Sequence, residues 1–102
     1  MTLNERDEIL RSSDFTGKVR IAFCDWLEYW VVNGTETIED DKLREDTNLL
    51  ITLALSNQEF YVNKLAVLAI SEPSVRDAVE ITDANVSAAV VNLLSYALNY
   101  LI

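Results

Sequence analysis

The chain has 102 residues, half of them apolar, with only two glycines and one proline, and this composition argues against extended disorder and turn-rich β-sandwiches. Seventeen acidic residues against eight scattered basic ones give a formal net charge of −9, which disfavours direct nucleic-acid binding. The length is sufficient for a single helical domain, residues 1–102, whose modest core needs no metal or disulfide.

Capping residues and apolar spacing predict two helices in the first third of the chain. Thr2 and Glu5 match a capping box that begins a short helix, and this helix ends near Ser12. The Asn33-Gly34 pair is typical of a left-handed helix C-cap, and the alternative is the turn of a β-hairpin with TETI as second strand. Helix is favoured because the preceding apolar stripe repeats every three or four residues: Phe15, Val19, Ala22, Phe23, Trp26 and Trp30.

The middle of the chain carries two more helix-start patterns. Thr37 with Asp40 indicates an N-cap, and the acids after it are favourable near the positive end of a helix dipole. Ser56 with Glu59 indicates a second capping box. The apolar faces of these two helices are Leu43, Thr47, Leu50, Ile51, Leu53 and Ala54 in the first, and Phe60, Leu65, Leu68 and Ala69 in the second.

The last third of the chain predicts a short helix and a longer, more apolar one. Ser71 caps the short helix, Pro73 suits its first turn, and it ends near Glu80. Thr82 caps the final helix, which runs to the chain end. We therefore expect an all-α fold, a compact bundle of five or six short-to-medium helices with short connections.

Three asparagines, Asn85, Asn92 and Asn99, recur every seven residues in the final helix and form one narrow line, with Ser95 beside it. Nearly every other direction around this helix is apolar, and we expect one small chain to be unable to cover all of it. Two interpretations stay open. The asparagine line is a solvated edge of a central helix, or this helix meets another chain, where asparagines can pair and define register.

The second interpretation predicts protein-interface residues on the final helix and on the aromatic segment before Gly34. Trp26 and Trp30 share a helix face and are expected in the core, whereas Tyr29 points elsewhere and suits an interface anchor. On the final helix we expect the leucines to lie on an exposed flank. The predicted interface set is Tyr29, Asn92, Leu94, Leu98, Asn99, Leu101 and Ile102.

Residues for catalysis and cofactor binding are few. The chain has no histidine, the commonest general base and transition-metal ligand. The lone Cys24 is followed by Asp25, whose carboxylate raises a thiol pKa, so a structural core role is expected. The acidic residues of segment 36–46 lack the alternation and glycine of a calcium loop. We expect neither an enzyme nor a bound cofactor or metal.

The N-terminal ten residues are polar and lack a signal-peptide core, and the final segment carries several asparagines and serines and no basic flank. A buried helix is therefore predicted there in place of a membrane span.

Two stretches, NQEFYVNKLAVLAISEPSV and TDANVSAAVVNLLSYAL, resemble small all-helical proteins encoded by tailed bacteriophages among capsid, neck and tail genes. The resemblance lies in Asn57-Gln58 before Phe60-Tyr61, the break at Glu72-Pro73, and the helix start at residues 82–86, and it covers about half the chain. It implies a virion or assembly component, located in the virion or in the cytoplasm of the infected bacterium, that contacts copies of itself or neighbouring virion proteins.

Three functional classes follow. The preferred one is a non-catalytic structural or assembly protein. The main rival is an acidic mimic of nucleic acid that blocks a basic cleft of a host protein, motivated by six acids against two bases in residues 36–46. A subunit that lends its fold to a partner enzyme is the third.

Overall fold

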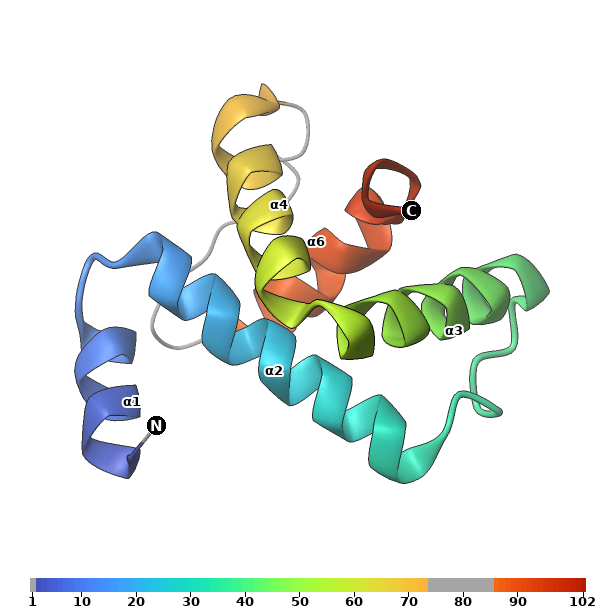
Figure 1. The fold of residues 1–102 in the computed structure, drawn as a ribbon, viewed down its shortest axis with the longest axis horizontal. Helices are drawn as coiled ribbons and strands as arrows, with labels where there is room; N and C mark the ends of the chain where they lie inside the picture. Colours follow the sequence, from blue (N-terminus) through green and yellow to red (C-terminus); the bar gives the residue numbers. More distant parts are fainter. Residues whose placement is uncertain (1, 74–85) are drawn as a thin grey trace.

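A computed structural model describes residues 2–73 and 86–102, and these residues form five helices and no strand. The helices are α1 (Leu3–Arg11), α2 (Phe15–Asn33), α3 (Asp41–Ser56), α4 (Gln58–Ser71) and α6 (Val86–Leu101). Figure 1 shows α2 as the longest element, with α1 beside its start and α6 passing behind it. The all-α prediction is confirmed. The predicted short helix near 73–80, the cap at Thr82 and the position of Asn85 lie outside the described residues.

The first two helices begin and end where the capping residues indicate. Thr2 and Glu5 form both hydrogen bonds of the capping box, and α1 ends at the C-cap Ser12. Helix α2 runs unbroken to Asn33, so the β-hairpin alternative is wrong. Gly34 has φ +77° and ψ 168°, a region open almost only to glycine, and its amide donates to the Trp30 carbonyl at 2.8 Å.

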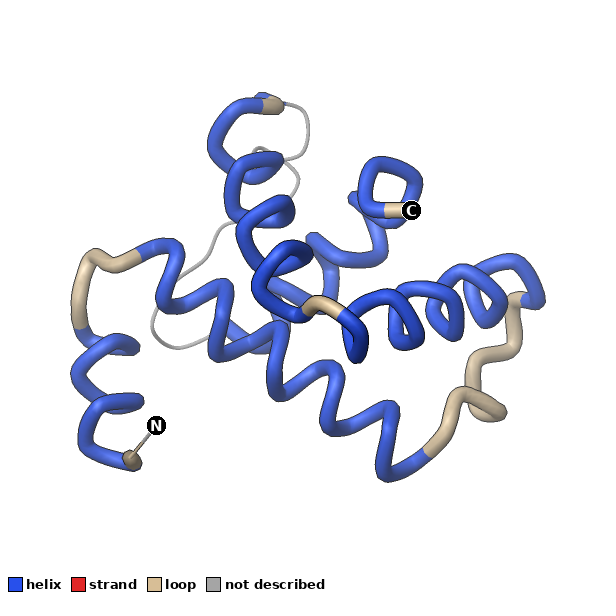
Figure 2. The backbone as a smooth tube through the Cα atoms, viewed as in Figure 1, coloured by secondary structure: helices blue, strands red, loops and turns tan. Residues whose placement is uncertain are grey.

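Two predicted caps are wrong by a few residues. Helix α3 is capped by Asp40, whose Oδ1 accepts from the Leu43 amide at 2.7 Å, while Thr37 lies in the preceding turn. Helix α4 is capped by Asn57, because Ser56 still belongs to α3 and donates its hydroxyl to the Leu53 carbonyl. Figure 2 shows both connections, a loop before α3 and a very short break between α3 and α4.

The core lies where α2, α4 and α6 meet, and α3 closes one side. The predicted α2 stripe is confirmed at its centre, with Val19, Phe23 and Trp26 buried and Trp30 packed at the edge. Phe60, expected in the core, is instead exposed. The radius of gyration, 13.2 Å, equals that of a compact domain of about 100 residues.

Helix α6 is covered by its own chain far more fully than its sequence led us to expect. Leu94, Leu98 and Leu101 are 1%, 5% and 1% exposed and belong to the core cluster. The prediction of an exposed leucine flank is therefore wrong. The physical reason is that α2, α3 and α4 all contact α6, so three helices together cover the side that carries these leucines.

Polar contacts connect α1 and α4 to α2, and the α2–α3 loop to α3. Arg6 on α1 forms a bidentate ion pair with Asp25 on α2, and Arg20 on α2 forms an ion pair with Glu59 on α4. In the loop before α3, the buried Thr35 donates its hydroxyl to Asn48 Oδ1 at 2.6 Å. Among the described residues no helix is long and apolar enough to cross a membrane.

Candidate protein-binding surface

The structure divides the predicted interface residues into an exposed group and a buried group. Tyr29 is 56% exposed, and Asn92, Asn99 and Ile102 are also exposed. The leucines at 94, 98 and 101 lie inside the core and present no surface to a partner. Any interface on this chain is therefore built from side chains other than these leucines.

The exposed face of α6 has a polar centre and apolar margins. With about 100° between successive residues, Asn92, Ser95 and Asn99 fall in the middle of this face. Val91 and Ile102 lie along one margin, and Tyr96 and Tyr100 along the other, all of them exposed. Asn92 and Asn99 face outward while the leucines face the core, so both interpretations of these asparagines, a solvated edge or a contact with another chain, stay open.

The C-terminal half of α2 exposes a second group of apolar side chains. Tyr29, Val31 and Val32 are all more than half exposed, although they sit in a helix that is otherwise largely buried. Sequence reasoning placed a binding region in the Trp26–Val32 segment and selected Tyr29 within it, but it did not single out the two valines, which fall outside the predicted stripe. Their departure from the three-and-four spacing was the available signal.

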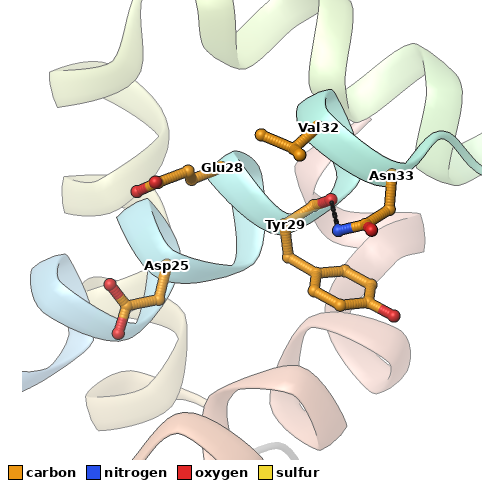
Figure 3. A pocket seen from close by; sticks show the side chains of 5 residues that line it. All are labelled: Asp25, Glu28, Tyr29, Val32 and Asn33. Carbon is orange, nitrogen blue, oxygen red and sulfur yellow. Dashed lines mark hydrogen bonds between the residues drawn. The ribbon is translucent and has the colours of Figure 1, made fainter.

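A hollow of about 340 Å³ lies on this part of α2, lined by Asp25, Glu28, Tyr29, Val32 and Asn33. Figure 3 shows the Tyr29 ring and the Asp25 carboxylate on one side of the helix and the Glu28 carboxylate on the other. The Asn33 side-chain amide donates to the Tyr29 carbonyl at 2.8 Å, which orders the last turn of the helix.

A second hollow, of about 320 Å³, lies between α2 and α6 and is almost entirely apolar. Its lining is Ala22, Asp25, Trp26, Tyr29, Trp30 and Val91. The rings of Tyr29 and Trp30 meet edge to face with centroids 5.0 Å apart, which gives this wall a defined shape. The two hollows share Asp25 and Tyr29 in their linings, so they lie next to each other. We call this region the α2–α6 surface, defined by Asp25, Glu28, Tyr29, Trp30, Val32 and Val91.

The charge of the α2–α6 surface is negative. Asp25 is neutralised by Arg6 from α1, whereas Glu28 forms no ion pair within the described residues. The last turn of α2 has no basic residue to offset the negative end of its helix dipole, and residues 86–102 carry no charged side chain. A cation approaching this surface would therefore meet an uncompensated carboxylate.

Three of the six acidic residues in segment 36–46 have structural roles. Asp40 caps α3, Asp41 pairs with Arg44 at 2.5 Å, and Asp46 pairs with Lys42 at 3.0 Å. The remaining acids, Glu36, Glu39 and Glu45, are exposed and form no ion pair within the described part of the chain. Beside this segment a hollow of about 330 Å³ between α3 and α6 is lined by Asp40, Lys42, Leu43, Asp46, Ser95, Leu98 and Asn99.

Cys24 lies on α2, is half-buried, and contacts Gln58 at the start of α4. The predicted core position is therefore only partly correct. The Cys24 Sγ accepts a hydrogen bond from Gln58 Nε2 at 3.0 Å. Burial raises the pKa of the Cys24 thiol above its ordinary value, and Asp25 also raises it, while the positive charge of Arg20 acts in the opposite direction. The thiol form is therefore favoured at neutral pH.

Residues 2–73 and 86–102 contain no group of three or more cysteine, aspartate or glutamate side chains placed to hold a metal ion. Comparison with models of protein families, with curated proteins and with solved structures found no match.

Proposed function

We propose that this chain is a non-catalytic structural or assembly protein that works by binding other protein subunits through the α2–α6 surface. The observation that carries the proposal is an apolar hollow lined by exposed Tyr29 and Val91, with exposed Val32 in the neighbouring hollow that also contains Tyr29. Contiguous exposed apolar area rimmed by polar groups is typical of protein-binding sites. A Tyr near the centre of such an area is a frequent energetic anchor.

The setting we propose is a tailed-bacteriophage particle, assembled in the cytoplasm of the infected bacterium and retained in the virion. This part of the proposal rests on the resemblance of the C-terminal half to phage-encoded helical proteins. The partners are then copies of the chain or neighbouring virion proteins.

Co-expression with the products of adjacent genes, followed by size-exclusion chromatography with light scattering, tests the proposal. We expect the full chain to elute in a complex with at least one neighbour or with itself. A chain that remains monomeric at high concentration and is retained by none of these proteins would contradict it. Truncation after Leu98 is unsuitable as a probe, because it removes the buried Leu101 and destabilises the fold.

The acidic-mimic rival is supported by one observation, the three exposed and unpaired carboxylates Glu36, Glu39 and Glu45. A mimic should lose affinity steeply with added salt and on changing these three residues to glutamine. An assembly protein that uses the α2–α6 surface should keep its partner after the same three changes. The triple variant measured in the co-expression assay separates the two.

A further inference from the structure

We infer that the α2–α6 surface receives an amphipathic helix of a partner protein, with an aliphatic side chain in the apolar hollow and an Arg or Lys against Glu28. This inference rests on the proposed function and specifies the chemistry of the partner. Helix-in-groove binding is a recurrent mode of peptide recognition, in which residues on one helical face act as anchors.

The shape of the hollow suits a side chain from a helix. Its walls belong to α2 and α6, and Trp26 and Ala22 line it beside the edge-to-face pair of Tyr29 and Trp30. Val91 forms the opposite wall on α6. A volume of about 320 Å³ with an almost wholly apolar lining accommodates one or two aliphatic side chains.

The charge around the hollow selects a cationic partner. The residues one helical turn from Glu28 include Asp25 on one side and Val31 and Val32 on the other. None of them is basic, so no neighbouring residue on α2 neutralises Glu28. The Arg6 guanidinium is already held by Asp25. The negative end of the α2 dipole, which has no basic residue in its last turn, adds to the same field, and residues 86–102 carry no charged side chain.

A second copy of the chain is a poorer occupant than a basic helix. Each copy carries a formal charge of −9, and a two-fold interface centred on Tyr29 would bring two Glu28 carboxylates toward each other. Like charges placed opposite one another across an interface suppress that pairing. No helix in the described residues presents an apolar stripe flanked by several arginines or lysines, so the chain offers no matching face of its own.

The probe is a synthetic helical peptide of about 18 residues, with leucines on one face at positions i, i+4 and i+7 and arginines flanking them. A matched peptide carries glutamate in place of every arginine. Both are labelled at the N-terminus and titrated with the full chain, and binding is followed by fluorescence anisotropy. We expect the arginine peptide to bind and the glutamate peptide to bind at least tenfold more weakly.

Variants of the chain locate the binding site. Tyr29→Ala should weaken binding roughly tenfold, because an exposed aromatic anchor is removed. Its control is Tyr96→Ala, which removes a tyrosine of similar exposure on the far margin of α6. Glu28→Gln should weaken binding by a factor of up to about five, as expected for an exposed ion pair, and Glu45→Gln is its charge-matched control. Far-UV circular dichroism and thermal melts establish that all four variants fold.

A charge exchange completes the test. Glu28→Arg should lose the arginine peptide and gain affinity for the glutamate peptide. Failure of the arginine peptide to bind, equal binding of both peptides, or equal effects of Tyr29→Ala and Tyr96→Ala would overturn the inference. Self-association that Tyr29→Ala abolishes would also overturn it, in favour of a second copy as the occupant.

Failure of this inference is distinguishable from failure of the proposed function. A neighbouring gene product that stays bound to both Tyr29→Ala and Glu28→Gln would refute the cationic-helix site and leave an assembly role through another surface. The absence of any complex with the wild-type chain would refute the assembly role itself.

Discussion

Asp40 and Thr37 both have side chains that can cap a helix, and the structure places only Asp40 at the start of α3. Its carboxylate accepts from the Leu43 amide and adds negative charge at the positive end of the helix dipole. Thr37 lies three residues earlier, in the turn that follows Gly34. Local sequence alone cannot show which of two nearby candidates caps the helix, because the conformation of the loop decides which side chain reaches the free amides.

Changing Asp40 to alanine should therefore lower the free energy of unfolding by about 0.5–2 kcal/mol, since one free amide of α3 loses its acceptor. Thr37→Ala should change it by less than about 0.5 kcal/mol, as for an ordinary surface substitution. Urea unfolding followed by circular dichroism measures both. Equal costs for the two variants would contradict the assignment of the cap.

The raised pKa of Cys24 has a measurable consequence. Alkylation requires the thiolate, so the rate with iodoacetamide should reach half its maximum at a higher pH in the folded chain than in urea. Arg20→Gln should move this midpoint further upward, because it removes the positive charge that favours the thiolate. A midpoint in the folded chain at or below that of the unfolded chain would show that Cys24 is not shielded by burial.

Among the elements, α6 departs most from what its sequence led us to expect. Because α6 is apolar on most sides, we expected part of its apolar surface to be free to contact another chain. The neighbouring helices instead cover Val90, Leu93, Leu94 and Leu98. What remains exposed in the described part of this helix includes Asn92, Asn99 and the margins beside them. The hydrophobicity of α6 is therefore explained by the chain's own core, and its contribution to binding is restricted to Val91 and the outward-facing side chains.

Two substitutions on α6 separate these roles. Leu94→Ala should lower the free energy of unfolding by about 2–5 kcal/mol, because it leaves a cavity in a buried site. Val91→Ala should cost less than about 1 kcal/mol but weaken binding of the arginine peptide, since Val91 lines the hollow. Urea unfolding and anisotropy titration provide the two readouts. A small stability cost for Leu94→Ala would restore the exposed-flank prediction.

At the scale of the whole molecule, the excess of acidic residues governs both stability and choice of partner. A net charge of −9 on a chain of this size places like charges close together, and the repulsion opposes the folded state. The five described ion pairs are at least partly exposed and offset little of this repulsion.

Added salt should therefore raise the Tm, because screening reduces repulsion between the acids more than it weakens the few ion pairs. The variant carrying glutamine at 36, 39 and 45 should melt higher than the wild type in low salt and respond less to added salt. Differential scanning fluorimetry in a sodium chloride series measures both. A Tm that falls with salt would show that the ion pairs dominate.

Much of the secondary structure was predictable from the sequence, whereas half of the candidate surface was not. The start of α1, the end of α2 at Gly34 and the outward position of Asn92 follow from hydrogen bonds and periodicities that act within a few residues. The α2–α6 hollow depends on which helices meet, and no local pattern encodes that.

The sequence by itself determined that the chain is helical, acidic and without histidine, because composition, capping and helical period can be read from the sequence alone. Tertiary structure decided that the leucines of α6 lie inside and that Tyr29 lies outside beside Val91. Burial depends on how many neighbouring helices cover a face, and that number is set by the packing of segments far apart in the chain.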